Sequence, residues 1–179
     1  EEHQTVDAGV TVRGAHHVKI VGNVIRDCLF GVNFEQTNQS IIENNRIRSK
    51  QRSLGLRGDG IRLWYSHANH IRLNHTTDVR DNVFWYSSAN KIQDNVGRDS
   101  RYSLHFMYAD RNEVVRNDYQ NNSVGIFLMF SQGSIVKENL VANSTGPFGI
   151  GIGMKESSDA LVENNDIFYN ARGFYLDSS

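Results

Sequence analysis

An asparagine recurs along this chain at nearly constant spacing, and each time it lies three positions after an isoleucine or a valine. The seven asparagines are Asn23, Asn45, Asn74, Asn95, Asn117, Asn139 and Asn165. Their successive spacings are 22, 29, 21, 22, 22 and 26 residues, so the underlying repeat has about 22 residues. A chain with this regularity stacks one structural unit on the next instead of folding around one globular core.

A second short apolar segment follows each asparagine after roughly eight to fifteen residues. These segments are GVNF (31–34), GIRL (60–63), NVFW (82–85), SLHF (103–106), GIFL (125–128), GIGI (149–152) and GFYL (173–176). Apolar residues alternate with period two in both segments, and no stretch shows a helical period. We therefore predict an all-β parallel β-helix of about seven to eight coils, in which the asparagines occupy left-handed turns and form a hydrogen-bonded ladder.

The bulk composition excludes several classes of function. The formal net charge of −1 gives no electrostatic basis for binding nucleic acid or an anionic membrane. No apolar run approaches the ~18 residues of a membrane-spanning helix, and the single cysteine, Cys28, can form no internal disulfide. We expect residues 1–179 to form one solenoid domain, a piece of a longer solenoid, because the pattern is still running at both ends.

Residues at matching repeat positions become neighbours in a β-helix, so the outward positions of the second segments can be read as columns. The first column is predicted to be Glu35, Trp64, Trp85, Met107, Met129, Gly153 and Asp177. The column two residues earlier is predicted to be Asn33, Arg62, Val83, His105, Phe127, Gly151 and Tyr175. The alignment is uncertain by one residue at 81–85 and at 149–154, where a shift would bring Met154 into the first column.

These columns place a histidine and two methionines on one outward face. Met107 and Met129 would lie about 4.8 Å apart at Cα, with His105 about 6.6 Å from Met107 along the strand. Thioether and imidazole donors suit Cu(I) far better than Mg²⁺ or Ca²⁺, so His105, Met107 and Met129 are candidate copper ligands. Trp64, Trp85, Met154 and Lys155 are candidates for supporting that site or for contacting a partner. Two other interpretations remain open, a protein-binding stripe without metal and simple packing under a loop.

A catalytic interpretation has a weaker basis. Asp78 and Asp99 occupy equivalent positions and would stack as a pair of carboxylates suited to acid–base chemistry. Arg80 and Arg101 follow at matching positions, so we expect the charges to neutralise one another. Carbohydrate-active enzymes also use parallel β-helices, and the fold alone does not decide. The two outward columns offer only Glu35 and Asp177, at opposite ends, and we expect no enzymatic activity.

Six segments resemble the NosD family of nitrous-oxide reductase maturation proteins. They are GDGIRLWYS (58–66), RDNVFWYS (80–87), SRYSLHFMYA (100–109), VGIFLMFS (124–131), GIGIGMK (149–155) and GFYLD (173–177). The resemblance covers roughly residues 58–177, and the first 57 residues match only as generic repeats. Ser103 and Asn82 stand where the family usually has glycine, which leaves the alignment near Asn82 in doubt.

The resemblance implies a right-handed parallel β-helix located in the periplasm. The resemblance also implies that the protein acts together with an ABC transporter, which comprises membrane and ATPase subunits. Together they would assemble the copper–sulfide centre of nitrous-oxide reductase. A copper chaperone and the reductase itself are the further partners that it implies. The resemblance assigns no ligand residues, so the copper ligands above rest on the columns alone.

Overall fold

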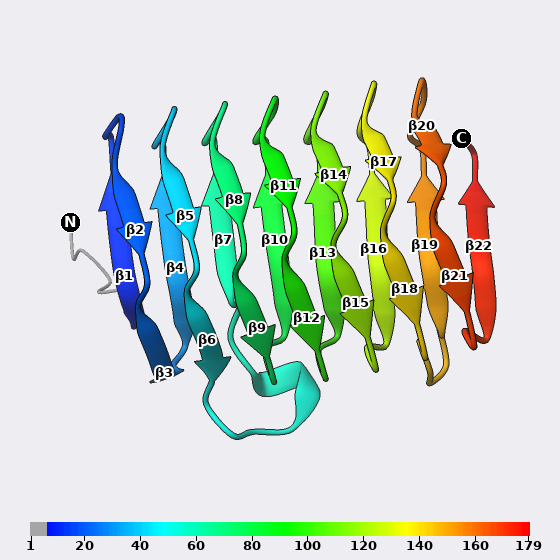
Figure 1. The fold of residues 1–179 in the computed structure, drawn as a ribbon, viewed down its shortest axis with the longest axis horizontal. Helices are drawn as coiled ribbons and strands as arrows, with labels where there is room; N and C mark the ends of the chain where they lie inside the picture. Colours follow the sequence, from blue (N-terminus) through cyan, green and yellow to red (C-terminus); the bar gives the residue numbers. More distant parts are fainter. Residues whose placement is uncertain (1–6) are drawn as a thin grey trace.

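The computed structural model describes residues 7–179, which form the predicted right-handed parallel β-helix (Figure 1). Each of the first seven coils contributes one strand to each of three sheets, the eighth contributes β22 to the first sheet, and every pairing between strands is parallel. Within residues 7–179, no helix is long and apolar enough to cross a membrane.

Each complete coil passes through the first, second and third sheets in that order. The first sheet contains β1 (Ala8–Arg13), β4 (Phe30–Glu35), β7 (Ile61–Trp64), β10 (Asp81–Trp85), β13 (Tyr102–Met107), β16 (Val124–Met129), β19 (Ile150–Lys155) and β22 (Arg172–Asp177). The second contains β2 (Lys19–Val21), β5 (Ile41–Glu43), β8 (His70–Arg72), β11 (Lys91–Gln93), β14 (Glu113–Val115), β17 (Ile135–Lys137) and β20 (Leu161–Glu163). The third contains β3 (Val24–Cys28), β6 (Arg46–Ser49), β9 (His75–Thr77), β12 (Val96–Arg98), β15 (Asp118–Gln120), β18 (Leu140–Ala142) and β21 (Asp166–Phe168).

Alternate residues of each strand point into the coil and stack on their equivalents in the next coil. On β13 the inward residues are Leu104 and Phe106, which pair with Ile126 and Leu128 of β16. All four are essentially fully buried. Each coil thus buries its apolar face against the neighbouring coils, which explains why the sequence must repeat.

The asparagine ladder runs through the turn between the second and third sheets. Asn95 is typical: its Oδ1 accepts hydrogen bonds from the backbone N and the Nδ2 of Asn74, both at 3.0 Å. Its Nδ2 donates to Asn117 Oδ1 and to the carbonyl of Ile71, both at 2.9 Å. The predicted ladder is confirmed, but the left-handed conformation belongs to the preceding residue, such as Asp94 with φ of 55°. The asparagine side chain satisfies the backbone groups that this bend leaves open.

A second polar ladder, which the sequence analysis did not predict, lies in the turn between the first and second sheets. Asn69 Nδ2 donates to Asn90 Oδ1 at 3.1 Å, and Asn90 Nδ2 donates to Asn112 Oδ1 at the same distance. Ser40 continues the ladder, since its backbone N donates to Asn69 Oδ1. The ladder begins with a serine and continues with three asparagines, so a search for one residue type recovers only part of its period.

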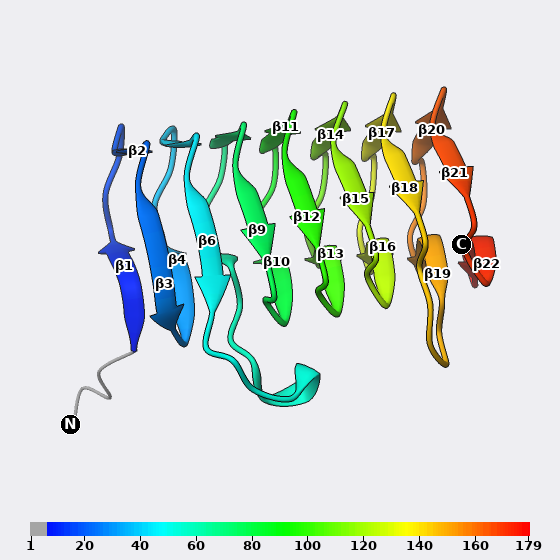
Figure 2. The same cartoon turned by 60° about the horizontal axis from the view of Figure 1, so that its bottom comes forward.

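Two insertions interrupt the repeat where the spacing predicted them. The first carries one turn of 3-10 helix, Leu54–Leu56, and projects from one side of the stack near the end of β6 (Figure 2). The second is a turn at 146–148, between β18 and β19. Both insertions leave the stacking of the coils intact.

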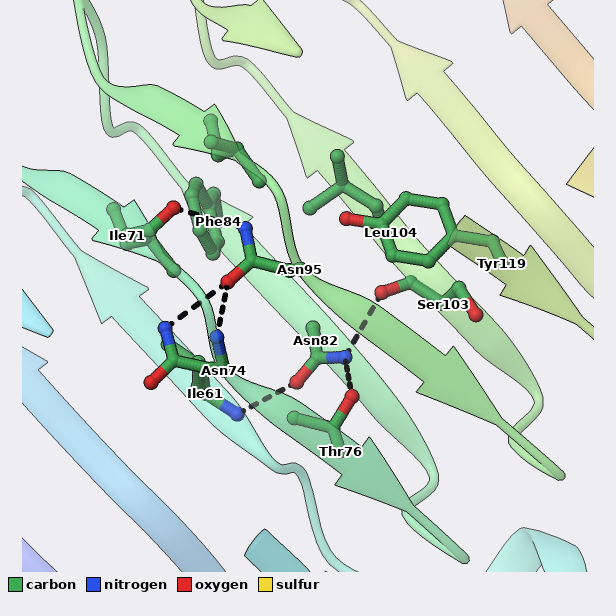
Figure 3. A pocket seen from close by; sticks show the side chains of 11 residues that line it. Ile61, Ile71, Asn74, Thr76, Asn82, Phe84, Asn95, Ser103, Leu104 and Tyr119 are labelled. Carbon is green, nitrogen blue, oxygen red and sulfur yellow. Dashed lines mark hydrogen bonds between the residues drawn. The ribbon is translucent and has the colours of Figure 1, made fainter. Parts of the chain in front are cut away.

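A small cavity lies inside the coils and is lined by residues of all three sheets (Figure 3). Asn82 crosses it, accepting a hydrogen bond from the backbone N of Ile61 and donating to Thr76 Oγ1 and to the carbonyl of Ser103. Gly97 borders this region, and a Cβ there would lie only 2.7 Å from Ser103 Oγ. Asn82 precedes Val83, whose strand partners Arg62 and His105 follow Ile61 and Leu104, so Asn82 fills an inward position that is apolar in both neighbouring coils.

Candidate functional site

The outward face of the first sheet brings the predicted columns together. Met107 pairs with Met129 on one side and with Trp85 on the other, and Trp85 pairs with Trp64. The second column places His105 between Val83 and Phe127. These pairings agree with the columns predicted for the coils from β7 to β16.

The doubtful alignment at 81–85 is settled by a bulge. The register between β10 and β13 shifts between Asp81 and Val83, so that Asp81 pairs with Tyr102 and Val83 with His105. Between these two pairs, β10 has one residue fewer than β13, and the shift in register accommodates this difference. Val83 and Trp85 therefore occupy the predicted columns. Asn82 lies at this bulge, where its side chain turns inward.

The alignment at 149–154 is wrong by two residues. Lys155, not Gly153, pairs with Met129, and Gly153, not Gly151, pairs with Phe127. Met154 pairs with Leu128 and belongs to the core, with 6% of its surface exposed. A shift of two residues keeps every side chain on its own face, so the two Gly-Ile pairs of this segment could not be distinguished by alternation. Met154 is therefore excluded as an outward residue.

The side chains of His105 and Met129 touch. The Nε2 of His105 lies 3.3 Å from the Sδ of Met129, across the boundary between β13 and β16. Met107 is the strand neighbour of Met129 and is half-buried, as Met129 is. One imidazole and two thioethers thus share a single patch of the sheet.

Aromatic rings shield the His105 imidazole from water. The ring of Tyr102 stacks on it with a centroid distance of 4.6 Å, and the ring of Phe127 lies edge-on at 6.2 Å. His105 is only 8% exposed. Burial lowers the pKa of His105 from 6.5 to about 4, because a charged imidazolium would lose its hydration here. The ring is neutral at physiological pH, which is the form that ligates metals.

Gly153 makes this shielding possible. A Cβ at this position would lie 2.5 Å from two ring carbons of Phe127. The ring of Phe127 therefore covers the backbone of β19 and joins a small outer cluster with Val124 and Ile150, against which Met129 packs. The sequence alone gave no reason for a glycine at this place.

The donor set on this face is soft. Among residues 7–179, no group of three or more His, Cys, Asp or Glu side chains is placed to hold a metal ion. His105, Met107 and Met129 offer one neutral nitrogen and two thioether sulfurs instead, which is a combination suited to Cu(I). The residues on this face therefore fit a soft monovalent ion and not a hard divalent one.

The aromatic residues of this face extend further than the sequence analysis predicted. Trp64 and Trp85 lie 5.4 Å apart at their ring centroids. Next to this column, at the start of the turn, a stack of rings runs parallel to it: Tyr65 on Tyr86 at 4.8 Å, Tyr86 on Tyr108 at 5.1 Å, and Tyr108 on Phe130 at 4.8 Å. We call Tyr65, Tyr86, Tyr108 and Phe130 the aromatic stack. The recurring aromatic after the Trp or Met column was the signal that could have identified it.

His105 and Met107 line a pocket that also contains two carboxylates, Asp59 and Asp81, which the sequence analysis did not select. Its lining includes Trp64, Trp85, Arg62, Asp59 and Asp81 in addition to the guanidinium groups of Arg80 and Arg101. Arg80 Nε and Nη2 bind the two oxygens of Asp59 at 2.9 and 3.0 Å. Arg101 binds the two oxygens of Asp81 in the same way.

The predicted pairing of these arginines was therefore wrong in part. The arginines are neutralised, but by Asp59 and Asp81 and not by Asp78 and Asp99. Asp78 lies in a left-handed turn at φ of 54°, where it pairs with Arg48 of β6 and with Arg57 of the first insertion. The pairs that form run between neighbouring coils, which alignment within one coil does not reveal.

The model of the NosD family, described as periplasmic copper-binding protein, matches residues 47–179 of this chain. No curated protein matches it. The matched range contains every strand from β7 to β22 and thus the whole patch formed by His105, Met107 and Met129. A family described by copper binding agrees with the soft donors found on this face. The chain belongs to the NosD family of periplasmic copper-binding proteins.

Proposed function

We propose that this protein is a non-enzymatic periplasmic maturation factor that holds Cu(I) on His105, Met107 and Met129. In this role it would work with an ABC transporter, comprising membrane and ATPase subunits, and with a copper chaperone to assemble the copper–sulfide centre of nitrous-oxide reductase. The observation that carries the proposal is the 3.3 Å approach of His105 Nε2 to Met129 Sδ, with Met107 paired beside it.

The chemistry of the three donors supports copper in the reduced state. A neutral imidazole and two thioethers bring no negative charge to the ion, so they favour a monovalent, polarisable metal. Arg62, Arg80 and Arg101 line the adjoining pocket and would disfavour a second positive charge on the ion. A bound Cu(I) would be held without releasing a proton, because His105 is already neutral.

The ligand assignment is tested by titrating Cu(I) against a competing chelator. We expect His105→Gln, Met107→Leu and Met129→Leu each to weaken binding about tenfold or more, equivalent to about 1.4 kcal/mol. Met154→Leu is the matched control, because Met154 lies in the core of the next coil and should leave the affinity unchanged. Fluorescence gives a second readout, since Trp85 is the strand neighbour of Met107 and the chain has only two tryptophans.

A triple variant lacking all three donors decides the question. Parental affinity in that variant would overturn the assignment of the ligands. If the parent chain itself bound no Cu(I), the face would act only as a protein-binding scaffold.

The aromatic stack favours a role in docking as well. Tyr65 and Tyr108 are both 44% exposed, and the stack follows the same four coils that carry Trp64, Trp85, Met107 and Met129. Charged or polar residues bound it at both ends, Glu35 and Gln36 on one side and Lys155 and Glu156 on the other. Tyrosine, tryptophan and methionine inside a polar rim are typical of protein interfaces. We propose that the copper-carrying partners dock on this surface.

The docking proposal is tested by binding of a purified copper chaperone or of nitrous-oxide reductase. Tyr86→Ser with Tyr108→Ser should weaken the complex at least tenfold while copper binding by the isolated chain persists. Equal affinity for the parent and the double variant would place the interface elsewhere.

One observation favours the alternative of a carbohydrate-active enzyme: the carboxylates of Asp59 and Asp81 line the same pocket. Both oxygens of each carboxylate accept hydrogen bonds from a guanidinium group. Carboxylates held in this way are poorly placed to exchange a proton with a substrate. Assays of product release from pectin and alginate test this alternative directly.

A further inference from the structure

Two carboxylates are buried on the outward face of the first sheet, where the fold has no need of them. Asp59 and Asp81 are each only 2% exposed. Withdrawing a carboxylate from water is costly, and an ion pair at such a place offsets the cost without adding much stability. In the following coils the place of Asp81 is taken by Tyr102, Val124 and Ile150, so the stacking of coils does not require a carboxylate there. The two ion pairs therefore point to a role in binding.

Each buried carboxylate fixes one guanidinium group in the pocket. Arg80 and Arg101 use Nε and Nη2 on Asp59 and Asp81, respectively. The Nη1 of neither arginine donates a hydrogen bond to any of the residues that the structure describes. A guanidinium held along one edge in this way presents its remaining donors in a fixed direction.

A third arginine completes the set. Arg62 is held by Asn33, whose Oδ1 accepts from its Nη1 at 3.0 Å, and its guanidinium lies over the ring of Trp64. Arg62, Arg80 and Arg101 line the same pocket as Trp64 and Trp85. Within the pocket lining, three guanidinium groups face the two carboxylates of Asp59 and Asp81. Glu35 lies 3.8 Å from Arg62 Nη1, but it also pairs with Arg13 at 2.6 Å, so the group as a whole keeps one positive charge in excess.

We propose that this pocket binds one carboxylate group, supplied by a glutamate or aspartate side chain of the protein that docks on the copper face. A single negative charge matches the single excess positive charge, and the planar carboxylate matches the edge of a guanidinium. The tryptophan walls accommodate the methylene groups of such a side chain. Only the source of the carboxylate, a docking partner, rests on the function proposed above.

The test uses the metal-free chain and two small probes that differ in charge alone. Acetyl-glutamate amide and its neutral counterpart, acetyl-glutamine amide, are titrated at low ionic strength, where charge pairing is least screened. Tryptophan fluorescence reports binding, because Trp64 and Trp85 are the only tryptophans of the chain and both line the pocket. We expect saturable binding of the glutamate probe and none of the glutamine probe.

Two variants locate the binding. The affinity for the glutamate probe should fall about tenfold in Arg62→Gln and about tenfold in the double variant Asp59→Asn/Arg80→Gln. The double variant removes both charges of a buried pair together, so it leaves no unpaired carboxylate behind. Arg116→Gln is the matched control, because Arg116 pairs with Asp94 outside this pocket and should leave binding unchanged.

The outcomes separate this proposal from the copper proposal. Equal binding of the two probes, or full binding by both pocket variants, overturns the carboxylate site. Acetate binding as tightly as the glutamate probe would overturn a protein source and assign the pocket to free small carboxylates. Loss of Cu(I) binding has no bearing on these results, since the chain contains no copper in this experiment.

Discussion

The two faces of β13 differ in how much their residues vary from coil to coil. Its inward residues, Leu104 and Phe106, pair with Ile126 and Leu128, and an apolar residue of similar size stands at the matching place in most coils. Its outward residues, His105 and Met107, pair with Phe127 and Met129, and the matching places elsewhere hold residues as different as Glu35 and Lys155. The inward face is set by the need to stack one coil on the next. The outward face varies from coil to coil, so its chemistry is free to serve binding.

The largest expected effect tests the inward face. Phe106→Ala should reduce the free energy of unfolding by about 3–5 kcal/mol, because a fully buried ring between Phe84 and Leu128 is lost. Denaturation in urea measures the change. Phe148→Ala is the control: Phe148 is 60% exposed in the second insertion, and its loss should cost no more than about 0.5 kcal/mol. Similar losses for the two variants would remove the distinction between core and surface.

The next effect links the outward face to pH. The pKa of His105 is about 4 in the folded protein and 6.5 ordinarily, so the unfolded chain binds more protons between these values. Stability should therefore fall as the pH is lowered through this window, by about 3 kcal/mol at pH 4. The charged groups acting on the imidazole are Asp81, Arg101 and Arg80, and burial outweighs all three.

The His105→Gln variant should not show the loss of stability that protonation of His105 causes at low pH. It should keep the pH dependence that other groups contribute. The measurement is the unfolding free energy of the parent and the variant at pH 7 and pH 4. Parallel pH profiles for the two proteins would show that His105 is not shielded from water.

The polar ladder should have an intermediate effect. Asn95→Ala leaves the backbone N of Asn74 and the carbonyl of Ile71 without their buried partners, and the expected cost is about 1–3 kcal/mol. Asn23→Ala, at the exposed end of the same ladder, should cost clearly less. A cost at Asn23 equal to that at Asn95 would contradict the role of burial.

The smallest expected effect on stability falls on the outward face. Met107→Leu conserves volume at a half-buried position, so the unfolding free energy should change by less than about 1.5 kcal/mol. Cu(I) affinity should fall nevertheless, as proposed above. A large destabilisation without a change in copper affinity would assign Met107 to packing instead.

Repetition determined which parts of this molecule could be predicted. The parallel β-helix, the two insertions and the inward residues follow from a 22-residue period with alternating polarity, because each coil must present the same apolar face to the next. The columns from Trp64 to Met129 followed as well, since the spacing between these coils is nearly constant. The alignment of segment 149–155 was wrong because its two Gly-Ile pairs alternate identically, and the register became evident only from the pairing of Met154 with Leu128 in the core.

Sequence alone determined the architecture and the face on which His105, Met107 and Met129 lie, because period and alternation are local properties of the chain. Only the tertiary structure decided the contact between His105 and Met129, the shielding of the imidazole by Tyr102 and Phe127, and the pairing of Arg80 with Asp59. Each of these depends on side-chain directions across neighbouring coils, and on a glycine or a bulge in one coil that repositions a side chain in the next. The solenoid is determined by its repeat, and the site by the places where the repeat is broken.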